Sequence, residues 1–496
     1  MVERILRLDP ADMYRQMDFS TRDSYRKKVE KLSQHSRYSE QEVAEQALLM
    51  AESASQNGTT GKGKKMHVGY YLIDDGYAKL IQKLEYDRPL DERLMAMVED
   101  YPSVYFGIIG VHLFVLLMIV GILTSWGNQP IWMMLVTVAA SFLPALELSI
   151  VSTNRILSFL VPPRILPKLE FKEEIPHEYR TIIIVPTLLS SPEDVRAQFE
   201  ALEIRALASA NKALQFVLLS DFHDAPQEHM ESDDAILAEA FQQVNRLNLQ
   251  YSSRYGDKFL FFHRERLWNA GEEVWMGWER KRGKIEEFNQ LLRNPDAETS
   301  YSEFNEDFLH SLQKFPMQFV ITLDADTKLP PGTARTLIGT AAHPLNRAEV
   351  NEEDNIVTKG YGIFQPRVSI PPKSANKTWF ARIYSGNVGL DPYTTAVSDI
   401  YQDLFGEGIY TGKGLYDVAV FDKVLGNRLP ENSILSHDLL ESTYLRTALL
   451  TDIELFDDYP STYLSYSRRS HRWIRGDWQI LHWLFGQVPT KGEESK

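Results

Sequence analysis

The sequence predicts an α/β protein that carries a helical N-terminal region and two apolar helices long enough to cross a membrane. From residue 179 onward, short apolar runs alternate with helical patterns, which is typical of a Rossmann-like, doubly wound sheet. Two apolar runs precede this part, residues 104–124 and 131–151, and each has about the 20 residues that a bilayer requires. We therefore expect a helical region over residues 1–100, a hairpin with an interfacial helix over 101–160, and an α/β domain over 161–496.

Composition excludes some classes of partner and site. The 496 residues carry a formal net charge of −15, which argues against a nucleic-acid partner bound by phosphate neutralisation. An anionic substrate must therefore meet a local basic cluster. Cysteine is absent, so disulfides and thiolate metal sites are excluded.

The N-terminal region shows a clear helix start. Ser39 and Glu42 have the spacing of a capping box, in which each side chain bonds the backbone N–H of the other. Apolar residues follow at helical spacing and predict one buried face, namely Val43, Ala44, Ala47, Leu48 and Ala51.

The two apolar runs predict a transmembrane hairpin, with buried core helices as the alternative. Their connection is short and uncharged, and Trp126 and Trp132 lie at interface depth. Basic residues flank only the outer ends, which predicts that both flanking regions are cytoplasmic. Residues 154–160, before Pro162, suit a separate interfacial helix. The flanking basic residues are Lys79, Lys83, Arg88 and Arg93 before the hairpin, and Arg155, Arg164, Lys168 and Lys172 after it.

The first two predicted strands end in polar residues. Residues 181–185 form a buried strand that we expect Pro186 and Thr187 to stop. Residues 216–219 form the next strand, and Asp221 follows it. Asp221 is a candidate for binding a base or a ribose, although a capping role is an equal alternative.

A third buried strand leads directly into two carboxylates. The run from Phe319 to Leu323 is apolar and rich in β-branched residues, and Asp324 and Asp326 follow it. Ligands of open α/β sheets bind beyond the carboxyl ends of strands. Asp324 and Asp326 therefore predict a site for Mg²⁺ or Mn²⁺ held together with substrate phosphates, and the alternative is a solvated turn.

Three further stretches carry candidate residues. Gly283 and Lys284 follow a basic run and are expected to open a helix that faces an anion, unless the run is only a solvated turn. Glu407 and Gly408 lie in a glycine-dense loop, which implies a close backbone approach by a ligand or simply tight turns. Asp438 opens a predicted helix, where a buried carboxylate can act as a base.

The main cationic cluster of the second half contains Arg469, Arg472 and Trp473. Guanidinium groups bind phosphate oxygens in pairs of hydrogen bonds, and tryptophan rings stack on sugars. An amphipathic helix at the membrane interface is the alternative explanation for these residues.

Taken together, these motifs resemble the processive, membrane-bound inverting β-glycosyltransferases of the cellulose-synthase-like superfamily. The closest resemblance is to the glycosyltransferase region of cyclic β-1,2-glucan synthases, and it extends over nearly the whole chain. The order and spacing of the motifs are specific, although no single motif is. The superfamily usually has Thr-Glu-Asp at the base and Gln-x-x-Arg-Trp at the end. Here Ser436, His437 and Asp438 stand at the base, and Arg469 precedes Arg472 and Trp473.

The resemblance implies a GT-A fold and a role for each candidate. It assigns the donor UDP-glucose to a group of residues on the strand ends and the last helix. It also implies Mg²⁺ or Mn²⁺ on Asp326 and Asp324, Asp438 as the catalytic base, and a β-glucan acceptor on Trp473. We add Glu407 and Gly408 to the acceptor side. The donor residues are Pro186, Thr187, Asp221, Lys284, Asp324, Arg469 and Arg472.

The resemblance further implies a multi-pass protein of the bacterial inner membrane with a cytoplasmic catalytic domain. Full members of the family are far longer, with more transmembrane helices and glycoside-phosphorylase-like modules after this region, so we expect the chain to be a fragment or a short relative. Two other functions fit the same residues. One is the synthesis of a different β-glucan from UDP-glucose, and the other is a nucleotide-sugar-binding scaffold without catalysis.

Overall fold

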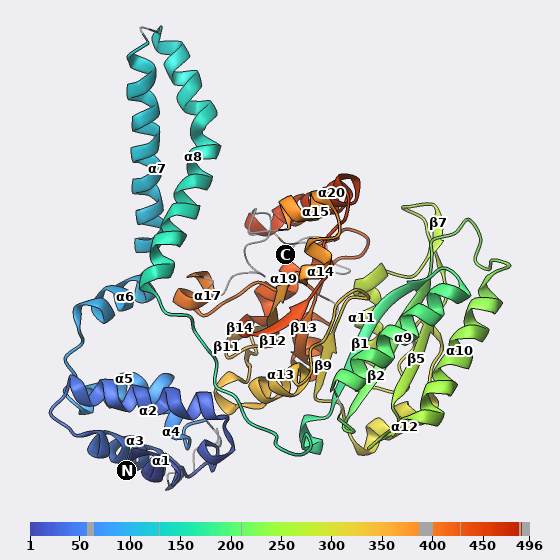
Figure 1. Ribbon diagram of the computed structural model, residues 1–496, viewed down its shortest axis with the longest axis horizontal. Coiled ribbons are helices and arrows are strands. Elements are labelled where there is room, and N and C mark those ends of the chain that lie inside the picture. Colours follow the sequence, from blue (N-terminus) through green and yellow to red (C-terminus); the bar gives the residue numbers. More distant parts are fainter. Residues whose placement is uncertain are drawn as a thin grey trace.

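A computed structural model describes residues 1–56, 64–127, 129–209, 211–385, 400–426, 428–485 and 488. A cluster of helices at the N-terminus lies beside an α/β domain, and a long helical pair projects away from both (Figure 1). The chain therefore changes architecture in the order that the sequence predicts: helices, hairpin, then sheet.

Six helices build the N-terminal region. The predicted capping box is confirmed, because the backbone N–H of Ser39 donates to Glu42 at 2.8 Å and the N–H of Glu42 donates to the Ser39 hydroxyl at 3.4 Å. The apolar residues after it are buried as the pattern predicts. The six helices are α1 (Val2–Leu6), α2 (Phe19–Gln34), α3 (Glu40–Gln56), α4 (Val68–Ile73), α5 (Tyr77–Lys83) and α6 (Leu90–Asp100).

The helical region is packed onto the α/β domain. Its buried residues belong to the same apolar cluster as those on one face of the sheet. Met17 forms an isolated bridge with Leu169, and the N–H of Asp18 donates to the Lys168 carbonyl at 3.1 Å. Lys168 is itself paired with Asp452 at the far end of the chain.

The hairpin consists of α7 (Pro102–Ser125) and α8 (Ile131–Leu160) (Figure 1). Both helices are long and apolar enough to cross a membrane, and only 6% and 11% of the residues in their apolar stretches are buried. A soluble core would bury most of such residues. This exposure disfavours the core-helix alternative.

The separate interfacial helix is wrong, because α8 continues without a break to Leu160. Residues 152–157 contain neither glycine nor proline, so nothing ends the helix there. Helix α7 also holds this part of α8: the Tyr105 hydroxyl donates to Asn154 at 2.7 Å, and His112 is hydrogen-bonded to Thr153 at 2.7 Å.

The α/β domain is built on one eight-stranded sheet in the order β14-β12-β13-β9-β1-β2-β5-β8. Strand β13 is antiparallel to both neighbours and β8 is antiparallel to β5, while the remaining pairs are parallel. The strands are β1 (Thr181–Leu189), β2 (Leu214–Phe222), β5 (Phe259–Arg264), β8 (Tyr301–Glu303), β9 (Phe319–Thr322), β12 (Ile363–Ser369), β13 (Gly414–Asp417) and β14 (Thr447–Phe456).

Helices cover both faces of this sheet (Figure 1). Alternate residues of β1 enter opposite cores: Ile183 packs with α9 (Pro192–Ser209), α10 (Asp233–Gln250) and α13 (Thr333–Ala342). Ile182 packs on the other face, with the helices α11 (Arg280–Arg293), α12 (Glu306–Lys314) and α18 (Val418–Leu425).

The central strands β5-β2-β1-β9 have the order of a doubly wound Rossmann sheet. The chain passes from β1 to β2 on one side, and later returns to place β9 on the other side of β1. A crevice opens at such a switch point, beyond the carboxyl ends of the strands. The residues that follow β1 and β9 are therefore the candidates for lining a ligand site.

The expectation that Pro186 and Thr187 end the first strand is wrong, because β1 runs to Leu189. Strand β1 pairs with β9 only as far as Ile184, whereas its pairing with β2 continues to the end. Residues two apart on a strand direct their backbone polar groups toward the same neighbouring strand, so those of Pro186 point the same way as those of Ile184. The Ile184 carbonyl accepts a hydrogen bond from the Leu323 N–H, on the β9 side. The missing N–H of Pro186 therefore faces the side where β9 has already ended, so the strand loses no bond.

The outer part of the hairpin is expected to be dispensable for folding. Replacing residues 113–148 with a short Gly-Ser linker keeps Tyr105, Ile109 and Asn154 at its base, where the hairpin meets the rest of the protein. We expect the far-ultraviolet circular dichroism per residue of the remaining elements to persist, and the need for detergent during purification to disappear. Collapse of the α/β signal in this variant would contradict the separation of hairpin and cores.

Candidate active site

The Asp-x-Asp turn lies at the switch point of the sheet and is fixed by a buried arginine. Asp324 and Asp326 directly follow β9, as the sequence predicts. Arg205 of α9, only 4% exposed, donates to the carbonyl of Ala325 at 2.6 Å and to that of Thr327 at 3.0 Å. The side chain of Thr327 in turn donates to Asp457 at 2.7 Å. The backbone of the turn is therefore positioned before any ligand arrives.

Two lysines neutralise the first carboxylate. Lys281, in the first turn of α11, is paired with one oxygen of Asp324, and Lys413 lies 3.1 Å from the other. Lys413 also pairs with Asp457, which follows β14. Burial alone raises the pKa of Asp324, but the two ammonium groups outweigh it and hold that pKa well below its usual range. Asp324 is therefore ionised and fully paired.

The second carboxylate, Asp326, is compensated less completely, because the charge of Lys413 lowers its pKa but does not outweigh the effects that raise it. Asp326 is accessible to solvent, and desolvation together with the negative charges of Asp457 and Asp324 raises its pKa. A carboxylate crowded by like charges is stabilised by a cation.

This donor set suits a hard cation only in part. The described residues contain no ready cluster of three His, Asp or Glu side chains for a metal. Mg²⁺, however, is commonly held by one or two carboxylates together with substrate phosphates. Asp326 fits that arrangement directly, whereas Asp324 is available only where a lysine releases one of its oxygens.

Asp438, the second residue of α19 (His437–Leu445), lies near Lys281 in the same site. A side chain added at Gly412 would place its Cβ 3.2 Å from the Lys281 ammonium and 3.5 Å from the Asp438 carboxylate. Gly412 has a φ of +78°, which favours glycine. Asp324 and Asp438 therefore share Lys281 as a neighbour.

The environment of Asp438 suits a base. Burial raises its pKa, and the charge of Glu441 adds to that effect, whereas His437 and Lys281 oppose it. His437 is hydrogen-bonded to Glu441 at 2.9 Å. Burial opposes the charged imidazole, but Glu441 outweighs it and raises the pKa of His437. A carboxylate with a raised pKa takes up a proton more readily near neutral pH.

The structure separates the two arginines of helix α20 (Tyr463–Gln479). Arg469 lies within electrostatic range of Asp326 and Asp457, which with Asp324 form the acidic cluster of the site. Its guanidinium packs on two aromatic rings, 4.8 Å from the Trp473 ring centre and 5.6 Å from that of Tyr459. Burial lowers the pKa of Arg469, and this effect outweighs the charges of Asp326 and Asp457, which raise it. Arg472 is solvent-exposed, and in the part of the chain that the structure describes it makes no ion pair. Trp473 is 37% exposed.

The loop of Glu407 and Gly408 is held by the protein itself. The N–H of Gly408 donates to the Thr447 carbonyl at 2.8 Å, and a Cβ at this position would lie 2.8 Å from Leu449. Glu407 lies 3.5 Å from Arg446 on the surface. Close packing on β14 explains the glycine without a ligand, so the acceptor role of this pair stays a prediction.

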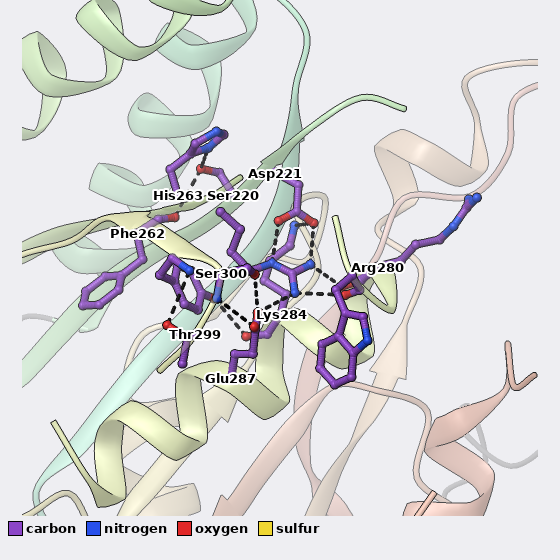
Figure 2. A network of polar contacts seen from close by, with 12 residues as sticks. Ser220, Asp221, Phe262, His263, Arg280, Lys284, Glu287, Thr299 and Ser300 are labelled. Atoms are coloured by element: carbon purple, nitrogen blue, oxygen red, sulfur yellow. Dashed lines mark hydrogen bonds and ion pairs between the residues drawn. The ribbon is translucent and has the colours of Figure 1, made fainter. Parts of the chain in front are cut away.

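Helix α11 begins at Arg280, so the prediction that Gly283 and Lys284 open it toward an anion is wrong. Gly283 is required inside the helix, since a Cβ there would lie 2.1 Å from the Trp278 carbonyl. The Lys284 side chain points inward (Figure 2) and bonds the Thr187 carbonyl. Lys281 is the lysine of this helix that reaches the site.

Asp221 belongs to a buried ion-pair network (Figure 2). Arg264 donates two hydrogen bonds to its carboxylate, at 2.8 and 2.9 Å, and Lys284 lies 3.1 Å away. Asp221 is 2% exposed and Lys284 also 2%. Burial lowers the pKa of Lys284 to about 8. This geometry favours a structural role over direct contact with a donor for Asp221 and Lys284, and Thr187 is likewise buried while Pro186 is partly exposed.

Comparison with known proteins agrees with the predicted family. The chain is 37% identical over 479 residues to the cyclic β-(1,2)-glucan synthase NdvB of Rhizobium meliloti (strain 1021). The chain is related to one region of the cyclic glucan synthases. The matched region covers 95% of this chain but 17% of the relative, and no protein-family model matches the chain.

Solved structures give weaker similarities. TarS residues 1–349 of S. aureus match with 12% identity and a TM-score of 0.28, over 56% of this chain and 60% of that chain. The same protein with UDP-GlcNAc gives a TM-score of 0.27, at 12% identity over 58% of this chain and 61% of that chain. The sheet order confirms the predicted Rossmann-like α/β class, with its helical N-terminal part and two apolar helices. The GT-A assignment stays a prediction.

Sequence reasoning missed four residues that shape this site, namely Arg205, Lys281, Lys413 and Asp457. Lys413 had a detectable signal, because it is the charged residue between two glycines of the glycine-dense loop. Arg205 and Asp457 had none, because the turn residues they contact, Thr327 among them, lie more than a hundred residues away in the chain.

Two lysines on α11 are expected to respond differently to substitution. Lys284→Met removes one partner of a buried carboxylate, so we expect the free energy of unfolding to fall by about 3 kcal/mol. Lys281→Met, with its side chain 33% exposed, is the matched control and is expected to cost under about 1 kcal/mol. Urea denaturation followed by tryptophan fluorescence measures both. Equal costs would contradict the assignment of Lys284 to the interior.

Proposed function

We propose that this chain transfers glucose from UDP-glucose, with inversion, onto a growing β-1,2-glucan at the cytoplasmic face of the membrane. The observation that carries the proposal is the 37% identity to a cyclic β-(1,2)-glucan synthase over 95% of the chain. The site supports it, because Asp324, Asp326, Asp438 and Arg469 converge at the switch point of the sheet.

The proposed reaction is a single displacement at the sugar carbon C1. Asp438 accepts the proton of the acceptor hydroxyl as that oxygen forms its bond to C1. The bond between C1 and the diphosphate oxygen breaks, and UDP leaves with the electron pair. One displacement inverts the configuration, and it requires only one carboxylate base within hydrogen-bond reach of the acceptor.

Cationic side chains stabilise the departing diphosphate in this proposal. Arg469 faces the acidic cluster, and Lys281 and Lys413 line it. Asp326 and Asp324 are the residues that would hold a Mg²⁺ or Mn²⁺ ion, which would supply further charge neutralisation. Arg472 is solvent-exposed on α20, and in this proposal it approaches the donor from the solvent side. Trp473 offers a ring face to the acceptor sugar.

The hairpin supplies the membrane anchor in this proposal. Helices α7 and α8 present apolar side chains outward along their length. Around the hairpin, lysine and arginine residues occur only near its outer ends, with Arg155 in the last turns of α8 and the others beyond the two helices. This supports a cytoplasmic location for both flanking parts under the positive-inside rule. The lipid bilayer is then a partner of the chain, along with UDP-glucose and the glucan.

Replacing the base is expected to remove chemistry while leaving donor binding in place. Asp438→Asn keeps the size of the side chain but cannot take a proton, so glucose transfer should fall by about 10²–10⁴-fold. UDP-glucose affinity should change little. Transfer of labelled glucose to polymer, linkage analysis of the product and calorimetric titration of UDP-glucose measure these quantities.

Asp458→Asn is the control for this substitution, because Asp458 is paired with Lys328 on the surface and makes no contact with the site. It should transfer glucose at the wild-type rate. Near-normal transfer by Asp438→Asn would show that another group is the base, and Glu441 or Asp417 would be tested next.

The rate is expected to depend on pH through the same carboxylate. Burial raises the pKa of Asp438, and the charged groups around it are His437, Glu441 and Lys281. Because the base must be deprotonated, transfer should decline on acidification at a pH above the ordinary aspartate value of about 3.9. A kcat/KM profile against pH measures this. An acidic limb at or below 3.9, which is about the free aspartate value, would contradict the role of Asp438.

A further inference from the structure

Lys413 occupies an unusual place in the site, because its ammonium bridges two carboxylates that come from different strands. It lies 3.1 Å from Asp324, after β9, and pairs with Asp457, after β14. Its side chain is 15% exposed. Burial opposes its charge, but the two carboxylates outweigh it and raise the pKa of Lys413 above its ordinary value. The ammonium is therefore charged and held at a fixed point.

The backbone fixes this position. The Thr411 N–H and hydroxyl donate to Gln365, at 3.0 and 3.2 Å, which anchors the loop to β12. Gly414 lies so close to β12 that a Cβ there would be 2.4 Å from the Phe364 carbonyl. A lysine on a loop held this tightly keeps its side chain near the Asp-x-Asp turn.

The charges around the turn are unevenly matched. Both oxygens of Asp324 are occupied, one by Lys281 and one by Lys413. Asp326, two residues after Asp324, remains without a cation among the ion pairs of the described residues. A cation that is to bind both carboxylates must therefore displace an ammonium group from Asp324.

We propose that Lys413, held between Asp324 and Asp457, is a built-in counter-cation that competes with the divalent metal ion for Asp324. In the donor-free protein the ammonium occupies the carboxylates and keeps metal affinity low. When the donor arrives, its diphosphate offers the displaced ammonium new acceptor oxygens. Metal and nucleotide then strengthen the binding of each other, as thermodynamic linkage requires. This inference rests on the proposed function for its divalent metal ion and its diphosphate donor.

Lys413→Met, which keeps the length of the side chain and removes its charge, tests the competition. Mn²⁺ binding to the full chain in detergent, without nucleotide, is measured from the electron paramagnetic resonance signal of free Mn²⁺. Loss of a positive charge a few ångströms from the metal should tighten Mn²⁺ binding by about tenfold. The additional gain in Mn²⁺ affinity produced by saturating UDP should become smaller than in the wild type.

Lys328→Met is the matched control, because Lys328 follows the same turn but pairs with Asp458 on the surface. It removes the same net charge without touching Asp324 or Asp457. Its Mn²⁺ affinity should equal that of the wild type. Equal tightening in both variants would reduce the effect to net charge and overturn the proposal.

Other outcomes also decide the proposal. Unchanged or weaker Mn²⁺ binding in Lys413→Met overturns it, and so does the absence of Mn²⁺ binding in both the wild type and this variant. Should circular dichroism show that Lys413→Met does not fold, Lys413→Gln carries the same expectation, because its amide still donates a hydrogen bond to a carboxylate. The proposed function is tested separately, by glucose transfer and UDP-glucose binding of the wild type.

Discussion

The short pairing between β1 and β9 is the constraint on which the site depends. Strand β9 pairs with β1 only from Phe319 to Thr322, and β1 continues beyond it to Leu189 along β2. The backbone that leaves β9 must therefore turn into the space beside β1. Arg205 binds the carbonyls of that turn from α9, so the two aspartates emerge at a defined place. An early strand end and one buried arginine thus create the acidic edge of the crevice.

Charge balance then organises the other elements around this edge. Asp324 forms ion pairs with Lys281 of α11 and with Lys413 of the loop before β13. Lys413 also pairs with Asp457, which follows β14. Each ion pair joins segments that the sheet order already places near each other. Deeper in the domain, Asp221 is compensated by Arg264 and Lys284 instead. The interior network stabilises the fold, whereas the pairs at the edge remain exchangeable because water reaches them.

Short-range sequence patterns predicted the elements that depend on neighbouring residues. They failed for the features that depend on contacts between residues distant in sequence. The capping box at Ser39, the buried strand before Asp324 and the apolar hairpin helices all follow from short-range patterns, and the structure has them. The start of α11 was misplaced, because Gly283 looks like a helix boundary but is required by close packing on Trp278. The glycine-dense loop drew attention to the region of Lys413, but its ion pairs could not be predicted, because both partners are remote in sequence.

The base of the hairpin is joined mechanically to the site through helix α17 (Ile400–Phe405). Ile400 and Leu404 share an apolar cluster with Tyr105 and Ile109 of α7, and Asp403 accepts a hydrogen bond from the Arg164 N–H at 2.7 Å. The chain continues from α17 directly into the glycine-dense loop that ends at Lys413. That loop is anchored at both ends, to the hairpin base through α17 and to β12 through Thr411 and Gly414. One continuous, packed segment of chain therefore connects the base of the hairpin with the carboxylate cluster.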